Sequence, residues 1–292
     1  MDDLWYSEYY TPSARFSIKV KHQLHFEKSD FQTIAVFDSE DFGRFLTLDG
    51  VMMLTERDEF IYHEMITHPA MAVNPHIRRV LVIGAGDGGV LRELSKYPLI
   101  EAIDVVEIDA RVVAVCREYL PGTACGLDDP RVQLHIQDGL RFVRHKENAY
   151  DLIIVDSTDP FGPGEVLFTR EFYGNCLMAL KENGILVNQN ESPFYKEDAL
   201  SMQSAHQCIS RIFPVSEIFQ AHIPTYPSGH WLFGFASKGL HPLADLRQAE
   251  WERLGISTRY YNTQLHRGAF CLPNYVKEQL NDAKEHPHFS GL

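Results

Sequence analysis

The sequence predicts an α/β fold, in which a small N-terminal domain of β-strands precedes a Rossmann-like, doubly wound sheet. The first observation is a strand-like alternation of apolar and polar residues between about residues 16 and 54. The second is a regular succession of strand and helix patterns from Arg78 onward, which is typical of a parallel sheet with helices on both faces. We therefore expect an N-terminal β domain over residues 1–55, a Rossmann-like domain over residues 56–285 and a C-terminal tail over residues 286–292.

The N-terminal domain is expected to consist of short strands. Its clearest strand patterns are residues 31–37, 42–48 and 51–54, and Asp49-Gly50 between the last two is typical of a tight turn. Thr55-Glu56-Arg57-Asp58 then has the pattern of a helix capping box. Its helix is expected to extend to about Met71 with its apolar residues on one face.

The larger domain is expected to alternate between strands and helices. Its predicted elements, in order, are strand 80–83, helix 90–96, strand 103–107, helix 110–119, strand 132–136, strand 152–155, helix 170–180, strand 185–188, helix 199–212, strand 215–221 and strand 231–237. The segment Pro224-Thr225-Tyr226-Pro227-Ser228-Gly229 joins the last two strands, which are expected to be an antiparallel addition to the sheet.

Charge and composition exclude several classes of function. The 292 residues carry 27 lysines and arginines against 40 acids, a formal net charge of −13 that repels nucleic acid and attracts small polycations. No apolar stretch approaches the roughly 20 residues of a membrane helix, and the acidic start lacks the regions of a signal peptide. The 5 cysteines form no CxxC pair, which favours reduced thiols. We therefore expect a cytoplasmic protein that contacts neither membrane nor nucleic acid.

Two carboxylates follow the most apolar strand pattern of the chain. The run Leu152-Ile153-Ile154-Val155 is typical of a central parallel strand, and Asp156-Ser157-Thr158-Asp159-Pro160 comes directly after it. Ligands of such sheets bind beyond the carboxyl ends of the strands. A pair of acids at that edge is suited to a cation that must lose a proton, so Asp156 and Asp159 are candidate site residues.

A glycine turn and an acid indicate a second part of the same site. The first predicted strand of the larger domain runs into Gly84-Ala85-Gly86-Asp87-Gly88-Gly89, and Glu107 ends the next strand, where an acid can bind the ribose hydroxyls of an adenosine. The turn also satisfies GxGxxG, but the Asp87 carboxylate would repel a dinucleotide pyrophosphate. An adenosyl sulfonium is favoured instead. Asp138-Gly139, after the following strand, suits an adenine edge.

At this point the sequence resembles the polyamine aminopropyltransferase family, nearly from end to end. The resemblance rests on Asp49-Gly50, Glu56-Arg57-Asp58-Glu59-Phe60-Ile61-Tyr62-His63-Glu64-Met65, the glycine turn, Asp156 to Pro160 with Gly162-Pro163, and Ile223-Pro224-Thr225-Tyr226-Pro227-Ser228-Gly229. It implies a methyltransferase-type Rossmann-like domain. It also implies transfer of an aminopropyl group from decarboxylated S-adenosylmethionine, as a co-substrate, to putrescine, with spermidine and 5′-methylthioadenosine as products.

The resemblance also implies roles for single residues. Asp156 corresponds to the family's proton acceptor. Further residues would hold the amines, namely Tyr62, His63, Asp87, Asp159 and Tyr226. The nucleoside contacts would be Gln32, Gly84, Gly86, Glu107, Asp138, Gly139 and Pro163. The family resemblance implies a homodimer or homotetramer, and neither a metal nor a tightly bound cofactor is expected.

Several alternatives remain open from the sequence. Cadaverine, agmatine or a triamine could replace putrescine, and Glu191 is an additional acid that could hold the distal amine. A methyltransferase acting on an amine is the other enzyme class, which Asp87 opposes; a silent polyamine-binding relative is opposed by Asp87 and Asp156 together. His63 and His68 are five positions apart, so on a helix they point to different faces and do not form the HExxH zinc motif.

Overall fold

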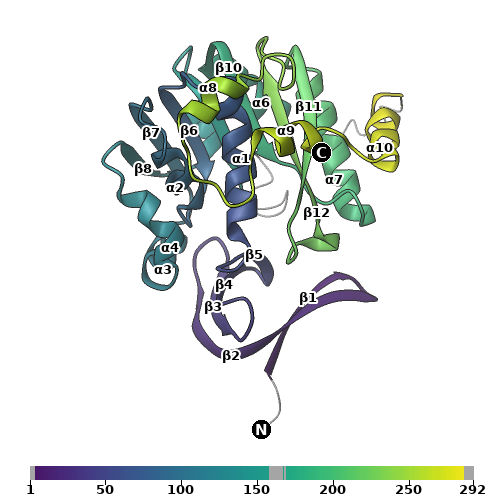
Figure 1. The fold of residues 1–292 in the computed structure, drawn as a ribbon. Helices are drawn as coiled ribbons and strands as arrows, with labels where there is room; N and C mark the ends of the chain where they lie inside the picture. The colour runs from purple at the N-terminus through teal and green to yellow at the C-terminus, as the bar shows by residue number, and fades with distance from the viewer. Residues whose placement is uncertain (1–3, 158–166, 168, 286–292) are drawn as a thin grey trace.

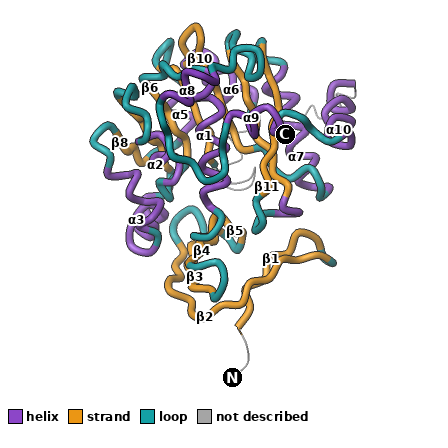
Figure 2. Tube along the Cα trace, in the orientation of Figure 1, coloured by secondary structure: helices purple, strands orange, loops and turns teal. Residues whose placement is uncertain are grey.

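The protein folds into two β-sheets, and helices pack around the larger one. The structure is a computed structural model that describes residues 4–157, 167 and 169–285. In Figure 1 the N-terminal sheet, drawn in purple, lies below the larger sheet and is joined to it through α1 (Glu59–Val73). Figure 2 shows that strands dominate the N-terminal part, whereas helices surround the strands of the larger part. The predicted fold class is therefore confirmed.

The N-terminal sheet is antiparallel and its five strands follow the order of the chain. Its strands are β1 (Leu4–Thr11), β2 (Ala14–Lys28), β3 (Thr33–Ser39), β4 (Arg44–Leu48) and β5 (Val51–Thr55). The three predicted strands correspond to β3, β4 and β5, and the predicted turn at Asp49-Gly50 is present with positive φ at both residues. The prediction omits β1, which is half-exposed and paired with β2 alone, and it names no separate strand for β2.

The predicted capping box is wrong in detail. Thr55 still belongs to β5, and α1 begins three residues beyond Glu56, at Glu59. The Asp58 amide still donates to the Thr55 hydroxyl at 3.4 Å, as in a capping box, but Asp58 itself is the residue that precedes the helix. The Thr55 hydroxyl donates in turn to the Asp58 carboxylate at 2.6 Å. Asp58 thereby connects the end of the first sheet to the start of α1.

The larger sheet is mixed and its seven strands have the order β11-β12-β10-β9-β6-β7-β8. The run from β10 to β8 is parallel, and β12 is antiparallel to both β10 and β11, as predicted for the late pair. The strands are β6 (Arg79–Gly84), β7 (Ala102–Glu107), β8 (Val132–Ile136), β9 (Tyr150–Asp156), β10 (Leu180–Gln189), β11 (Val215–His222) and β12 (His230–Ser237). All of the predicted strands of this domain are present, with ends that differ by a few residues.

Successive residues of the central strands point to opposite faces, and both faces are covered by helices. Val80 and Val82 pack with α1, α2 and α3 on one face, whereas Leu81 and Ile83 pack with α5 and α6 on the other. The helices, besides α1, are α2 (Gly89–Ser95), α3 (Ala110–Tyr119), α4 (Pro121–Ala124), α5 (Gly139–Val143), α6 (Arg170–Ala179), α7 (Lys196–Ser210), α8 (Gln248–Arg253), α9 (Thr263–Ala269) and α10 (Asn274–Glu285), with 3₁₀ turns η1 (Cys125–Asp128) and η3 (Pro227–Gly229).

The predictions end at β12 and omit α8, α9 and α10. In Figure 1 these helices, drawn in yellow-green to yellow, lie against earlier elements: α8 beside α1, α9 beside β11 and α10 beside α7. The buried carboxylate of Glu64 on α1 holds this segment in place, since it accepts hydrogen bonds from the backbone amides of Arg259, Tyr260 and Tyr261. The Arg259 guanidinium also stacks on the Phe60 ring, 3.6 Å from its centre.

The order of the strands creates a switch point between β6 and β9. From β6 the chain builds β7 and β8 on one side and then crosses to build β9 and β10 on the other. Ligands of doubly wound sheets bind at the carboxyl ends of strands beside such a point. Within the described ranges, no helix combines the length and apolarity of a membrane span. The five cysteines all lie in the described part and none is in a disulfide.

Candidate active site

A cavity of about 260 Å³ lies at the switch point, between the carboxyl edge of the larger sheet and the N-terminal sheet. The larger sheet contributes the ends of β6, β7 and β9, and the N-terminal sheet contributes residues of β1, β4 and β5. Both halves of the site predicted from the sequence, the glycine turn with its acids and the carboxylate after the central strand, line this one cavity.

The two halves meet because β6 and β9 are direct neighbours. Gly84 pairs with Asp156 in the parallel register, and the Ala85 amide donates to the Asp156 carbonyl at 3.0 Å. A β-carbon on Gly84 would lie 1.9 Å from that carbonyl oxygen, and the φ of Gly84 is +88°. Only glycine permits this close approach. The turn therefore places Asp87 and Asp156 in the same crevice.

Asp156 has one paired and one unpaired carboxylate oxygen. The Tyr62 hydroxyl donates to Oδ1 at 2.5 Å, whereas Oδ2 is buried and has no hydrogen-bond partner among the described residues. Burial, together with the charge of Asp87, raises the pKa of Asp156 to about 6. Such a carboxylate is ionised at neutral pH and is a better proton acceptor than an exposed aspartate.

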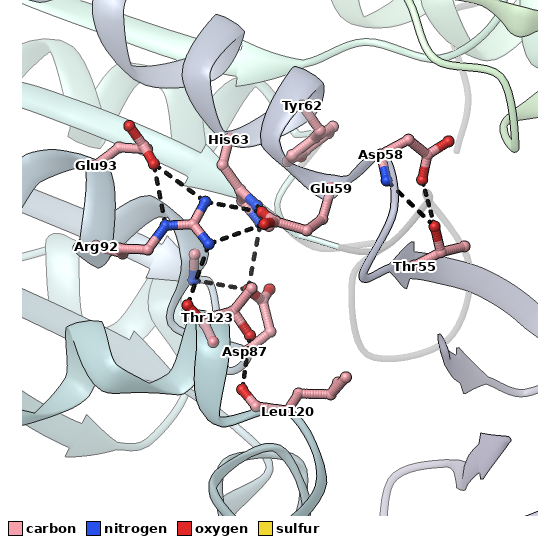
Figure 3. A network of polar contacts seen from close by, with 12 residues as sticks. Thr55, Asp58, Glu59, Tyr62, His63, Asp87, Arg92, Glu93, Leu120 and Thr123 are labelled. Carbon is pink, nitrogen blue, oxygen red and sulfur yellow. Dashed lines mark hydrogen bonds and ion pairs between the residues drawn. The ribbon is translucent and has the colours of Figure 1, made fainter. Parts of the chain in front are cut away.

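A chain of ionic contacts runs from the glycine turn into α1 and α2. Figure 3 shows the Arg92 guanidinium between Glu93 and Glu59, with the His63 imidazole beside Glu59 and Asp87 close to it. Two Arg92 nitrogens donate to the two Glu59 oxygens at 2.8 Å each. Glu59 Oε2 lies 2.6 Å from His63 Nδ1, and His63 Nε2 lies 3.2 Å from Asp87 Oδ1.

The charges in this chain support one another. Burial alone would lower the pKa of His63, but Asp87 and Glu59 raise it to about 10. Burial opposes ionisation of Asp87, yet the charge of His63 holds its pKa below the ordinary value. Burial likewise opposes ionisation of Glu59, and His63 and Arg92 nevertheless lower its pKa to about 2. At neutral pH the histidine is therefore an imidazolium between two carboxylates.

The nucleoside half of the cavity is organised around Glu107, the last residue of β7. Its Oε1 accepts from the Asp109 amide at 2.9 Å, and burial raises its pKa to about 7. A β-carbon on Gly86 would lie 2.9 Å from Glu107 Oε2, so the glycine leaves this carboxylate accessible to a ligand. Asp138 caps the N-terminus of α5, where its Oδ1 accepts from the Arg141 amide at 2.8 Å, and Gly139 follows it in the wall.

Gln32 reaches the same half of the cavity from the N-terminal sheet. Its side-chain amide donates to Asp109 Oδ2 at 3.2 Å, and the Ser29 hydroxyl donates to the same oxygen at 2.6 Å. Asp109 also caps the N-terminus of α3, where it accepts from the Arg111 amide. The smaller domain is thus fixed to the turn that carries Glu107.

The opposite wall is aromatic and is attached to the first sheet. The Tyr226 hydroxyl donates to the Met53 carbonyl at 2.6 Å, and its ring contacts those of Tyr62 and Trp231. The buried Asp58 accepts from both the amide and the hydroxyl of Thr225, at 3.1 and 2.8 Å. These bonds fix the segment between β11 and β12 against the cavity.

Three further acids line the cavity, from β1, from the segment after β10 and from α7. Glu8, Glu191 and Asp198 are in its wall, together with Gln189 and Tyr10. The Gln189 side-chain carbonyl accepts from the Glu191 amide at 3.2 Å, and Glu191 has a φ of +62°. The sequence indicates Glu191 as a site residue. It gives no sign that Glu8 and Asp198, which are 190 positions apart in the chain, line the same cavity.

Most of the predicted site residues line one cavity, and two lie outside the described residues. In the wall are Gln32, Tyr62, His63, Gly84, Gly86, Asp87, Glu107, Asp138, Gly139, Asp156 and Tyr226. Asp159 and Pro163 belong to the part of the chain that the structure does not describe. Sequence reasoning misses Glu59 and Arg92. The spacing of Glu59 and His63, one helical turn apart, is the signal that could have indicated the first of them.

His63, Asp87 and Asp156 bring one potential ligand atom each within 4.8 Å of one another. A metal ion would require a lone pair on the imidazole, whereas the position of His63 between two carboxylates favours its protonated form. In that form a metal would lose one of its three ligands, whereas the carboxylates of Asp87 and Asp156 can still accept hydrogen bonds from an organic ammonium.

Nearly the whole chain is similar to known proteins. The family model described as a spermine/spermidine synthase domain matches residues 59–247, and the model described as a spermidine synthase tetramerisation domain matches residues 4–56. A polyamine aminopropyltransferase of Clostridium perfringens is 66% identical over 284 residues, which cover 97% of this chain and 100% of the relative. That of Clostridium beijerinckii is 62% identical over 279 residues, covering 96% and 98%.

Solved structures agree with this similarity. A spermidine synthase in complex with the transition-state analogue AdoDATO superposes with a TM-score of 0.93 and 42% identity, covering 95% of each chain. The spermidine synthase of Thermotoga maritima has a TM-score of 0.90 and 40% identity, covering 95% of this chain and 94% of the other. The similarity thus extends over both sheets and the cavity between them.

Proposed function

The chain belongs to the spermine/spermidine synthase family, and on that premise we propose that it transfers the aminopropyl group of decarboxylated S-adenosylmethionine to putrescine. The products would be spermidine and 5′-methylthioadenosine. The observation that carries the proposal is the buried, unpaired Oδ2 of Asp156, which lies at the same sheet edge as Asp87 and Glu107. The family to which the chain belongs supports transfer of an aminopropyl group to an amine. Putrescine as that amine is part of our proposal.

The donor would lie across the carboxyl ends of β6 and β7. Glu107 would accept hydrogen bonds from the two ribose hydroxyls, and Asp138 would accept from the adenine amine. Asp87 would hold the ammonium of the aminopropyl group. This orientation would direct the carbon beside the sulfur toward Asp156 and the aromatic wall.

The reaction would be a single displacement. The nitrogen lone pair of the acceptor forms a bond to the carbon beside sulfur, and the carbon–sulfur electron pair moves to sulfur, which becomes a neutral thioether. The proton that the nitrogen loses passes to Asp156 Oδ2, directly or through water. A sulfonium is already a good leaving group, so the reaction requires neither a metal nor a covalent intermediate.

The acceptor must lose a proton that the surrounding acids tend to retain. An alkylammonium has a pKa near 10, by analogy with lysine, and neighbouring carboxylates raise it further. Burial among Tyr62, Tyr226 and Trp231 acts in the opposite direction, because desolvation disfavours the ammonium. We infer that positioning of the nitrogen in line with the carbon–sulfur bond contributes much of the rate.

The same charges would select the decarboxylated donor. Ordinary S-adenosylmethionine carries an additional carboxylate next to its amine, and that group would approach Asp87. Two like charges at about 4 Å cost about 4 kcal/mol at an effective dielectric constant near 20, which corresponds to roughly a thousandfold in affinity. A methyltransferase would have no use for an acid at this position.

Putrescine is the proposed acceptor because a second set of acids lines the same cavity. Glu8, Glu191 and Asp198 could hold the distal ammonium of a diamine while the near nitrogen lies beside Asp156. Cadaverine, agmatine or a triamine would use the same two ends. We also propose that the chain forms a homo-oligomer through the N-terminal sheet, since residues 4–56 match a tetramerisation domain. A cytoplasmic location remains a prediction.

A product screen tests the proposal. The protein is incubated with decarboxylated or ordinary S-adenosylmethionine and a panel of linear amines, and the products are identified by mass spectrometry. We expect spermidine from the decarboxylated donor and putrescine, at the highest kcat/KM of the panel. Methylated amines from the ordinary donor, or no product from any diamine, would exclude the proposed reaction.

A further inference from the structure

The contacts around His63 point to a role for Glu59 and Arg92, neither of which is among the residues proposed to bind the substrates. The imidazole has a fixed place, since a β-carbon on Gly89 would lie 2.3 Å from its Cε1. Both of its nitrogens face carboxylates, Glu59 at 2.6 Å and Asp87 at 3.2 Å. Glu59 in turn has no freedom to turn away, because Arg92 holds both of its oxygens.

We propose that Glu59, held by Arg92, is a positioning residue that keeps one proton on His63 Nδ1. When the donor binds, Nε2 then loses its own proton and accepts a hydrogen bond from the donor ammonium. This inference rests on the proposed function, since it assumes a donor whose ammonium contacts Asp87. In the empty site the Nε2–H of the imidazolium occupies Asp87 in place of that ammonium. Donor binding therefore exchanges one cation for another.

A count of charges supports the exchange. The titratable and charged groups around the imidazole are Glu59 and Tyr62 of α1, Asp87 of the glycine turn, Arg92 of α2, Asp156 of β9 and, next to Asp87, the buried thiol of Cys116 on α3. Arg92 neutralises Glu59, and burial keeps Tyr62 and Cys116 uncharged. Asp87 and Asp156 then face one imidazolium.

The donor brings two further positive charges to those two carboxylates, a sulfonium and an ammonium. The imidazolium becomes a third cation in a buried space, and its repulsion of the ammonium at hydrogen-bond range favours loss of the Nε2 proton to solvent. No bond other than N–H changes in this step. The neutral imidazole that remains has its Nδ1–H directed at Glu59 and its lone pair at Nε2 directed at the donor.

Glu59 decides which nitrogen retains the proton. Without an acceptor at Nδ1, the neutral ring could keep its proton on Nε2, where it would point at the incoming ammonium rather than accept from it. The tautomer that Glu59 selects is the one that adds a second hydrogen-bond acceptor beside Asp87. This arrangement discriminates in favour of ligands that carry a free ammonium at that place.

Calorimetry of ligand binding tests the inference. Decarboxylated S-adenosylmethionine and 5′-methylthioadenosine are titrated into the full-length protein at pH 8.5 in buffers with different enthalpies of protonation. At that pH the carboxyls of Glu107 and Asp156, with pKa values of about 7 and 6, are ionised, whereas an alkylammonium, with a pKa near 10, remains protonated. We expect the donor to release about one proton more than the nucleoside product, which lacks the ammonium.

Three variants assign the proton and the positioning role. His63→Gln should abolish the additional proton release while the nucleoside still binds. In the wild-type protein we expect donor affinity to rise tenfold per pH unit between about pH 8 and 9. Glu59→Gln should retain binding, but this rise should level off at a lower pH, because His63 then holds its proton less firmly. Asp104→Asn alters another acid–histidine pair, with His135 at 2.9 Å, outside the cavity wall, and should change neither quantity.

The outcomes separate this inference from the proposed function. Equal proton release by donor and nucleoside in the wild-type protein would overturn the exchange at His63, even if the enzyme makes spermidine. A wild-type pH dependence in Glu59→Gln would overturn the role of Glu59. Absence of any binding or turnover of the decarboxylated donor would instead refute the proposed function and the inference with it.

Discussion

The Tyr62 hydroxyl donates to Oδ1 of Asp156 at 2.5 Å, although the two residues are 94 positions apart in the chain. Burial and the charge of Asp156 raise the pKa of Tyr62 well above its ordinary value, so the phenol keeps its proton and acts only as a donor. The bond holds one carboxylate oxygen and leaves the other, Oδ2, without a partner among the described residues. A proton acceptor is thereby both fixed and available.

Removing this phenol should change the pH profile of the enzyme. The hydrogen bond from Tyr62 stabilises the ionised form of Asp156 and so limits the rise of its pKa, which burial and the charge of Asp87 still bring to about 6. In Tyr62→Phe that pKa should rise by about one to two units, because a hydrogen bond to a charged group is worth about 1.5–3 kcal/mol. Since the base must be ionised, the acid limb of kcat/KM should move to higher pH, while activity near pH 9 falls less.

Tyr226→Phe is the matched control for this profile. Its hydroxyl donates to the Met53 carbonyl and not to Asp156. Its loss should alter KM for the acceptor and leave the acid limb where it is. Equal acid limbs in wild-type enzyme and Tyr62→Phe would show that Asp156 does not set the profile.

Asp156→Asn tests the proton acceptor itself. An asparagine amide has nearly the same shape and can still accept from Tyr62, but it cannot take up a proton. We expect kcat to fall by about 10²–10⁴, the usual contribution of a general base, while calorimetry shows unchanged binding of 5′-methylthioadenosine. Asp151→Asn at the opposite end of β9 removes a carboxylate that binds the Arg79 amide and Lys181. It should lower the melting temperature and spare kcat, which separates catalysis from stability.

Glu107 should make nucleoside binding depend on pH. Its carboxyl has a pKa of about 7 in the empty site because of burial, and only the ionised form accepts hydrogen bonds from both ribose hydroxyls. The protonated form predominates below pH 7, so binding should tighten by about tenfold from pH 6 to pH 8 and then level off. Calorimetry with 5′-methylthioadenosine measures this. In Glu107→Gln the affinity should be weaker and flat over the same range; a slope that persists there would assign it to another group.

The sequence indicates this site because its main parts are local. The glycine turn and the acids that end β7 and β9 each follow from neighbouring residues, and the switch point brings them together by topology alone. The family resemblance adds Tyr62 and Tyr226. Their rings are in contact, but their spacing in the sequence does not predict it.

Other parts depend on contacts that no local pattern contains. We expect α1 to have one apolar face, but His63, Glu64 and His68 are buried as well, because α2, α8 and the sheet surround the helix. Each of these polar side chains has a partner far away in sequence, and Arg92, 33 positions from Glu59, is one such residue. Helices α8 and α9 are short, and the segment between them is held by Glu64, almost 200 positions earlier, so their own sequence gives little sign of them.

The last prediction concerns the segment that carries Tyr226. The buried Asp58 carboxylate accepts three hydrogen bonds, from the Thr55 hydroxyl and from the amide and hydroxyl of Thr225. In Asp58→Ala these donors lose their acceptor, which should cost about 1–3 kcal/mol for a buried donor left unpaired and loosen the aromatic wall. We expect KM for the acceptor to rise at least tenfold, whereas calorimetry shows little change for 5′-methylthioadenosine, because Glu107 and Asp138 lie on other elements. Thr225→Ser retains both donors to Asp58 and should keep the wild-type KM. If Asp58→Ala weakened nucleoside and acceptor to the same extent, Asp58 would support the whole cavity rather than its acceptor wall.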